Sequence, residues 1–265
     1  MAAAAAASSG MHIKERPTEN SICVPATTRN RVISSTIKPP CVNTCATMLL
    51  VAKPNSGKSV VCQSFLKRKT QYRKAFHHVY LVAPAGARSA FKSCVFKDHP
   101  EEKVFGTLDE DTLDSLEEHL DQVGEENDEG EDDPEYETQY TLWCLDDVQA
   151  ELKVPAIEKR LKNIFCSYRH RCLSVWCLVQ SYMAVPKQIR DCTRCVLQWK
   201  PSSLREIETF REEVLGMLTM DQMKTLIKFV YKEKHDFMWV DRERRTITRN
   251  LAKLQITMDD DELLI

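Results

Sequence analysis

Short apolar runs alternate with longer amphipathic stretches through the central part of the chain. Each short run is bounded by turn-forming residues and predicts a buried strand. The predicted strands are 47–52, 78–84, 140–147, 173–180 and 195–200. In the longer stretches apolar residues recur every three to four positions, and these predict helices at 59–74, 108–123, 154–170, 204–218 and 219–233. Strands that alternate with helices predict an α/β fold with a mainly parallel sheet flanked by helices.

The two ends of the chain lack this pattern. Residues 1–40 are polar, contain four prolines and show little periodicity, so they are predicted to be a disordered or linker arm. Residues 236–251 are predicted to form a terminal hairpin with its turn near 241–245, and 258–265 to form an acidic tail. The predicted domain is therefore 41–257, with a helical and hairpin extension at its C-terminal end.

Charge divides the chain into two unlike parts. Residues 101–137 carry 18 Asp or Glu and one basic residue, which leaves 36 Lys or Arg against 21 Asp or Glu elsewhere, a formal +15. The run 124–137 is predicted to be too charged to order itself, so 101–137 is expected to be an acidic, partly disordered insert. A basic body is typical of proteins that bind a polyanion, although a solvated surface is the plainer interpretation.

Composition bounds the class of protein. Hydrophobic residues make up 43% of 265 residues, enough for one sizeable core. No apolar run approaches the roughly 20 residues that span a bilayer, and the N-terminus lacks the features of a secretory signal. The 11 cysteines are therefore expected to be reduced thiols in an unsecreted protein. Cys192 and Cys195 form a C-x-x-C, but one of them opens a predicted strand, which disfavours a zinc site.

The stretch TMLLVAKPNSGKSVVCQSFLKR (47–68) carries the first candidate chemistry. An apolar strand runs into a polar loop and then into a helix, the arrangement that presents backbone N–H groups to phosphate. Gly57 allows close backbone approach, Lys58 would reach the β- and γ-phosphates, and the Ser59 hydroxyl would ligate Mg²⁺. Ala52 replaces the usual first glycine at little cost if its φ is negative. The predicted nucleotide-binding residues are Ala52, Pro54, Asn55, Ser56, Gly57, Lys58, Ser59 and Val60.

The strand TLWCLDD (141–147) carries the second motif. It is apolar and ends in two carboxylates, as a Walker B strand does. Asp146 would hold Mg²⁺ with Ser59, and Asp147 would polarise the attacking water, with Glu151 as the alternative base. A turn capped by acidic residues would explain the pair alone. The two motifs together, in this order, favour Mg²⁺-dependent ATP hydrolysis.

The segment SYRHRCLSVWCLVQSYMAVPKQIRD (167–191) resembles the DNA-packaging ATPases of nucleocytoplasmic large DNA viruses, the poxvirus type, within the FtsK/HerA superfamily of P-loop ATPases. These are also found in polinton-like elements and virophages. The resemblance covers about 47–199 and continues more faintly through the C-terminal helices. It implies that the strand ending at Gln180 lies between the strands of the two motifs. Ala52 and the long acidic insert depart from the family pattern.

The resemblance also implies roles for two further side chains. Gln180 would be the sensor that touches the γ-phosphate or the attacking water, which suits an amide that can both donate and accept. Arg169 would reach the nucleotide of a neighbouring subunit, with Arg171 and Arg190 as weaker alternatives. A surface ion pair is the plainer interpretation of each arginine.

Taken with the motifs, the resemblance implies a motor that uses ATP and Mg²⁺ to move double-stranded DNA into a viral capsid. Its expected partners are duplex DNA held by phosphate contacts, further copies of the chain in a ring, and capsid or portal proteins. It is expected at sites of virion assembly in the host cytoplasm or nucleus, or in the virion. A P-loop nucleotide or small-molecule kinase and a non-catalytic nucleotide-binding capsid component are the alternatives.

Overall fold

The computed structural model describes residues 11–15, 37–86, 95–96 and 98–258. The strands are β1 (Met11–Glu15), β2 (Thr47–Val51), β3 (His78–Val82), β4 (Val104–Phe105), β5 (Thr141–Asp146), β6 (Leu173–Val179), β7 (Cys195–Trp199), β8 (Phe237–Asp241), β9 (Thr246–Arg249) and β10 (Ala252–Met258). The helices are α1 (Lys58–Lys67), α3 (Glu110–Glu129), α4 (Pro155–Ser167), α5 (Lys187–Asp191), α6 (Leu204–Val214) and α7 (Met220–Val230). Short 3₁₀ turns are η1 (Glu101–Lys103), η2 (Glu151–Lys153) and η3 (Tyr182–Ala184).

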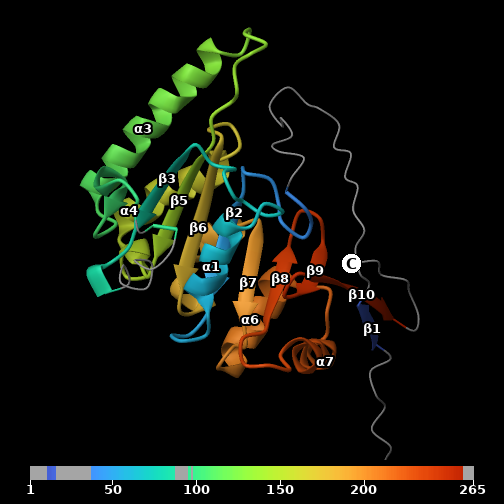
Figure 1. The fold of residues 1–265 in the computed structure, drawn as a ribbon. Helices are drawn as coiled ribbons and strands as arrows, with labels where there is room; N and C mark the ends of the chain where they lie inside the picture. Colours follow the sequence, from blue (N-terminus) through green and yellow to red (C-terminus); the bar gives the residue numbers. More distant parts are fainter. Residues whose placement is uncertain (1–10, 16–36, 87–94, 97, 259–265) are drawn as a thin grey trace, which may run out of the picture.

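All the strands belong to one mixed sheet, in the order β1-β10-β9-β8-β7-β2-β6-β5-β3-β4 (Figure 1). From β7 to β4 every neighbouring pair is parallel, and from β7 to β1 every neighbouring pair is antiparallel. β6, the strand that precedes Gln180, lies between β2 and β5, which confirms the order implied by the resemblance. The parallel half therefore brings the ends of β2, β6 and β5 to one carboxyl edge.

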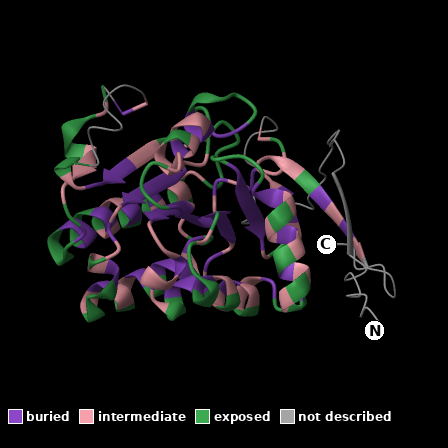
Figure 2. Ribbon diagram, turned by 90° about the horizontal axis from the view of Figure 1, so that it is seen from below, coloured by how far each residue is buried: buried purple, intermediate pink, exposed green. Residues whose placement is uncertain are grey.

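Each face of the sheet is buried under its own set of helices. Side chains alternate along a strand, so Leu49 and Val51 of β2 join one core with α3, α4, α6 and α7, while Met48 and Leu50 join the other with α1. Figure 2 shows the buried strands between helices whose outer faces are exposed. Trp176 in the α1 core meets the rings of Phe65 and Tyr72 edge to face. Among the described residues no helix is long and apolar enough to cross a membrane.

Helix α1 is shorter than predicted and ends at Lys67 instead of residue 74. The chain turns there because Tyr72 is directed into the core. Its ring is 1% exposed, its backbone N–H bonds the Phe65 carbonyl, and its hydroxyl donates to the Val42 carbonyl at 2.9 Å. Burial of this aromatic side chain outweighs continuation of a helix rich in cations.

Helix α3 is longer than predicted and continues to Glu129, so the expectation that 124–137 could not order itself is wrong for its helical part. Tertiary contacts also hold the chain that follows. The Asn127 amide accepts from the Gln139 N–H at 2.8 Å and donates to the Gln139 carbonyl at 3.1 Å, and the Tyr136 hydroxyl donates to the Asn127 amide at 3.0 Å. Specific polar contacts therefore order a segment whose composition alone predicts disorder.

The antiparallel half of the sheet is larger than the predicted hairpin. β10 extends the β8–β9 pair through 252–258, and β1, inside the predicted linker arm, pairs with β10 in antiparallel register. The rest of the arm before residue 37 and the tail after 258 lie outside the described residues. The expectation of an unstructured arm is therefore wrong for 11–15.

Candidate functional site

The loop between β2 and α1 has the backbone that a phosphate-binding loop requires. Gly57 has φ 94° and Asn55 φ 63°, both in the left-handed region, which glycine and asparagine tolerate best. Ala52 does not have a positive φ, and the residue is buried at 3% exposure. The missing first glycine therefore causes no backbone strain at this position.

Side chains and loop atoms from three strands converge on one cavity of about 280 Å³ at the carboxyl edge. The lining residues are Lys53, Pro54, Asn55, Ser56, Gly57, Lys58, Ser59, Val60, Asp146, Asp147 and Gln180. Of the predicted nucleotide-binding set, Ala52 lies in the core below instead. The loop follows β2, the two aspartates follow β5 and Gln180 follows β6, so the parallel strand ends assemble the cavity.

Asp146 and Lys58 form the charged centre of this cavity. Lys58 Nζ lies 3.4 Å from Asp146 Oδ1, and the side chains are 11% and 5% exposed. Burial raises the pKa of Asp146 above its usual value, and the Lys58 ammonium opposes that rise. Opposite charges of this kind, next to the Ser59 hydroxyl at the start of α1, supply both a cation for phosphate and oxygen ligands for a hard metal ion.

Asp147 is held in a strained conformation beside Gln180. Its φ is 61°, and its backbone N–H donates to the Leu178 carbonyl at 3.0 Å. Gln180 Nε2 donates to Asp147 Oδ1 at 2.8 Å, which fixes the carboxylate toward the cavity. The structure therefore links the predicted sensor directly to the predicted base. The roles themselves stay predictions.

Two residues that contact the site at this edge were not predicted from the sequence. The Gln149 side chain accepts from the Gln180 backbone N–H at 3.0 Å. His235, in the loop between α7 and β8, places its ring Nδ1 3.1 Å from the Ser56 carbonyl in the phosphate-binding loop. Because His235 is 179 residues from Ser56 and stands in no motif, no local pattern indicates the contact.

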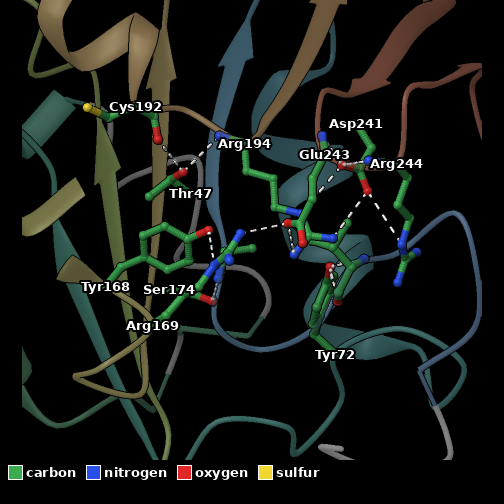
Figure 3. Close-up of polar contacts among 12 residues, drawn as sticks. Thr47, Tyr72, Tyr168, Arg169, Ser174, Cys192, Arg194, Asp241, Glu243 and Arg244 are labelled. Atoms are coloured by element: carbon green, nitrogen blue, oxygen red, sulfur yellow. Dashed lines mark hydrogen bonds and ion pairs between the residues drawn. The ribbon is translucent and has the colours of Figure 1, made fainter. Parts of the chain in front are cut away.

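Arg169 directly precedes β6 and therefore lies at the opposite, amino edge of the same sheet. Figure 3 shows its polar contacts. Its Nη2 donates to Glu243 Oε2 at 2.8 Å and its Nε to the Tyr168 hydroxyl at 3.0 Å. Arg194 Nη1 lies 2.8 Å from the same Glu243 oxygen. The seven residues of β6 separate this loop from Gln180, roughly 20 Å of extended chain. The structure therefore does not bring Arg169 to the cavity of its own chain.

The alternative arginines differ from Arg169 in their surroundings. Arg190 forms a two-pronged pair with Glu213, at 2.7 and 2.8 Å, and its Nη1 donates to the Val185 carbonyl. Its side chain is 10% exposed, so it is committed to the fold. Its burial and its pair with Glu213 disfavour Arg190 as a residue that reaches another subunit. Arg171 Nη1 lies 3.4 Å from Asp121 Oδ1 on α3, and the Arg171 side chain is 37% exposed.

The C-x-x-C cysteines do not act as a pair. Cys195 is fully buried in β7, whereas Cys192 Sγ lies 2.9 Å from Cys166 Sγ on α4. Burial, with the neighbouring Cys166 thiol, raises the pKa of Cys192 to about 11. Within the described parts of the chain, no three His, Cys, Asp or Glu side chains form a group that could hold a metal ion.

Comparisons with known proteins agree with this geometry. A family model described as Poxvirus A32 protein matches residues 41–231. The genome packaging NTPase B204 from Sulfolobus turreted icosahedral virus 2, in complex with AMPPCP, superposes with a TM-score of 0.53 at 14% identity, over 78% of this chain and 97% of that chain. The cytoplasmic domain of the Thermomonospora curvata type VII secretion ATPase EccC gives 0.55 at 11% identity, over 82% of this chain and 26% of that one.

A further match is EssC (ATPases 2 and 3) from Geobacillus thermodenitrificans, with a TM-score of 0.52 at 15% identity, over 82% of this chain and 41% of that chain. No curated protein sequence matches. At sequence identities of 11–15%, these structural similarities show only that the fold is shared. They confirm the predicted α/β fold, a mainly parallel sheet of the P-loop FtsK/HerA type.

Proposed function

The chain belongs to the family of the poxvirus A32 protein, and from this premise we propose that it is a Mg²⁺-dependent ATPase that drives double-stranded DNA into a viral capsid. One observation carries the proposal: Lys58, Asp146, Asp147 and Gln180, which lie up to 122 positions apart, line a single cavity with the phosphate-binding loop. The similarity in fold to B204, a genome packaging NTPase, supports the same activity here. We propose that residues 41–257 form the ATPase domain.

The residues at the carboxyl edge fit a nucleotide with Mg²⁺. Backbone N–H groups of 55–59 would surround the phosphates, and Lys58 would leave Asp146 to contact the β- and γ-phosphates. The Ser59 hydroxyl and the Asp146 carboxylate are the hard oxygen ligands that would hold Mg²⁺, which usually takes few protein ligands beside phosphate and water. When bound, Mg²⁺ neutralises the charge on the β- and γ-phosphate oxygens.

Asp147 and Gln180 are placed to act on the attacking water. We propose that Asp147 accepts a proton from that water as it attacks the γ-phosphorus. The hydrogen bond from Gln180 Nε2 orients the Asp147 carboxylate, and the Gln180 carbonyl oxygen can accept a hydrogen bond from the same water. Glu151 in η2 is the alternative base, and one of its carboxylate oxygens is buried without a hydrogen-bond partner among the described residues.

Arg169 would complete the site of a neighbouring copy. An arginine that contacts the γ-phosphate neutralises charge that develops in the transition state, and such a residue raises the rate by roughly 10³ to 10⁵. Since Arg169 lies at the edge away from its own cavity, this role requires an oligomer, and we propose a ring around the duplex. Capsid or portal proteins would bind the ring at sites of virion assembly in the host cytoplasm or nucleus.

ATP hydrolysis by the purified full chain, with and without long duplex DNA, tests the proposal. We expect Mg²⁺-dependent phosphate release that increases when DNA is added, and none with EDTA. The Lys58→Ala protein, prepared in the same way, controls for contaminating ATPases. Phosphate release equal to that of the Lys58→Ala protein would contradict the proposal. Transfer of the γ-phosphate to a nucleoside monophosphate would instead support the kinase alternative.

A further inference from the structure

The turn that follows α1 carries a dense group of cations. Within residues 67–74 five side chains are positively charged and exposed to solvent: Lys67, Arg68, Lys69, Arg73 and Lys74. In the parts of the chain that the structure describes, none of them forms an ion pair with a carboxylate, whereas the amino-edge arginines Arg169 and Arg194 both do. We refer to residues 67–74 as the cationic turn.

The cationic turn is held rigidly although its surface is charged. Gln71 and Tyr72 are 5% and 1% exposed, and the Tyr72 ring stacks on Phe76 with centroids 5.8 Å apart. The Thr70 carbonyl accepts from the Lys38 N–H at 2.9 Å, and further backbone bonds close the turn on itself. Because the backbone is fixed by this anchoring, the cations meet a ligand with little loss of backbone entropy.

Tyr72, the one aromatic residue of the turn, faces inward, and this selects the kind of ligand. Tyr72 packs on Trp176 in the core, so the outer surface offers charge but no ring on which a base could stack. A surface of unpaired Lys and Arg without stacking groups suits the phosphates of a duplex, which carry charge at regular spacing and need no sequence readout.

The cationic turn is also joined to the candidate nucleotide site by a single element. α1 starts at Lys58 in the phosphate-binding loop and ends at Lys67, so its ten residues span about 15 Å between the two. Phe65 and Leu66 pack the helix against the sheet as one body. A shift of the first turn of α1 on phosphate binding would therefore move the cationic turn with it.

We propose that the cationic turn binds the phosphate backbone of double-stranded DNA. This inference rests on the proposed function, which supplies the duplex. α1 then connects the groups that bind ATP phosphates, at its first residue, with the groups that bind DNA phosphates, beyond its last. The contact is independent of base sequence, as a motor that moves any DNA requires.

A charge-matched pair of triple variants tests the site. The first is Arg68→Gln, Lys69→Gln and Arg73→Gln. Lys74, whose φ is 59°, is left in place so that the left-handed position of the turn is unchanged. The control is Lys153→Gln, Lys159→Gln and Lys162→Gln, which removes three exposed cations at and near α4, on the opposite face of the sheet. Affinity for a fluorescent duplex is measured against salt concentration, with thermal unfolding and ATP affinity as checks on folding.

We expect the first triple variant to bind duplex at least tenfold more weakly at low salt, with a salt slope smaller by roughly 2–3. The control should stay within about threefold of the wild type, because α4 is not at the DNA surface. Equal losses in both variants would overturn the inference, since net charge alone would then explain binding. If the wild-type protein itself bound no duplex, the proposed function would fail instead.

Discussion

The two edges of the sheet are built from similar charged side chains but differ in completeness. At the carboxyl edge, the side chains of Lys58 and Asp146 are only 11% and 5% exposed, lie 3.4 Å apart and share a cavity with Asp147 and Gln180. At the amino edge, Arg169 and Glu243 lie 2.8 Å apart but are 47% and 46% exposed. An exposed pair of this kind stabilises a protein by about 0–1 kcal/mol, so Arg169 can leave Glu243 at little cost.

The difference between the two edges separates what one chain supplies by itself from what requires a second copy. The carboxyl edge brings together groups for phosphate, metal and water within a single copy. At the amino edge, Tyr168 and Glu243 orient the guanidinium of Arg169. The phosphate-binding cavity of the same chain lies at the opposite edge of the sheet, out of reach of this arginine. We therefore assign ATP binding to the carboxyl edge and propose that a second copy of the chain contributes to the reaction through its amino edge.

The largest expected effect comes from breaking the carboxyl edge. Lys58→Ala removes the phosphate cation and Asp146→Asn removes the carboxylate of the metal site, so each should reduce ATP hydrolysis to background. Steady-state phosphate release measures this. Lys159→Ala, an exposed lysine on α4, is the control and should hydrolyse ATP at the wild-type rate. Near-wild-type turnover in the Lys58→Ala protein would rule out the assigned site.

Breaking the amino edge should cost nearly as much, but only across subunits. Arg169→Ala is expected to slow hydrolysis by roughly 10³- to 10⁵-fold. Mixed with Lys58→Ala protein, it should recover activity, because an intact site then meets an intact arginine from its neighbour. Arg171→Ala, two positions away in the same loop, tests the weaker alternative for the same role and should keep most activity if Arg169 is the residue that reaches the neighbour. If the mixture recovers no activity, Arg169 has a local structural role instead.

A subtler change separates ATP binding from hydrolysis within the carboxyl edge. Asp147→Asn should bind ATP normally yet hydrolyse it about 10²- to 10⁴-fold more slowly, because the amide cannot accept the proton. Asparagine also tolerates the φ of 61° at this position, so the backbone should remain as it is. Fluorescent ATP binding and single-turnover hydrolysis measure the two steps. If binding fails as well, Asp147 is a metal ligand and Glu151 becomes the base.

The smallest expected effect concerns the acidic segment beside the amino edge. Tyr140, three positions after the end of that segment at residue 137, exchanges hydrogen bonds with His77, three positions after the cationic turn. The chain that follows the acidic segment is therefore bonded to the chain that follows the cationic turn, and we expect the acidic side chains to compete with DNA for those cations. Removing 124–137 would cut into α3, so neutralisation is the cleaner test. Asp132→Asn, Glu135→Gln and Glu137→Gln together should tighten duplex binding severalfold at low salt, with the gain shrinking as salt rises.

The control for that experiment is Glu110→Gln, Asp111→Asn and Glu118→Gln, which removes the same charge from the first half of α3. Its duplex affinity should change less, because screening weakens charges more than about 10 Å away. Equal affinities for the wild type and the first variant at low salt would leave the acidic segment without a role in DNA binding.

The sequence determined the parts of this protein that depend on short-range pattern. Three apolar runs of five to seven residues predict parallel strands: one leads into the loop that bears Lys58, one ends at Asp146 and one ends just before Gln180. The carboxyl ends of parallel strands meet at one edge of a sheet. The loop residues 54–60 and both aspartates therefore stand in the structure at the cavity that the motifs predict. The resemblance, not periodicity, supplied the position of β6 between β2 and β5.

The end of α1, the order of the acidic segment and the pairing of β1 could be seen only in the tertiary structure, because the contacts that set them join residues far apart in the chain. Burial of Tyr72 ended α1 early, and the bonds of Asn127 to residue 139 ordered an acidic segment that composition alone predicts to be disordered. Strand pairing over more than 200 residues placed β1 beside β10. Two further contacts leave no local pattern in the sequence: Glu243 with Arg169, 74 positions away, and His235 with Ser56. Packing of the whole fold sets which side chains meet across a sheet.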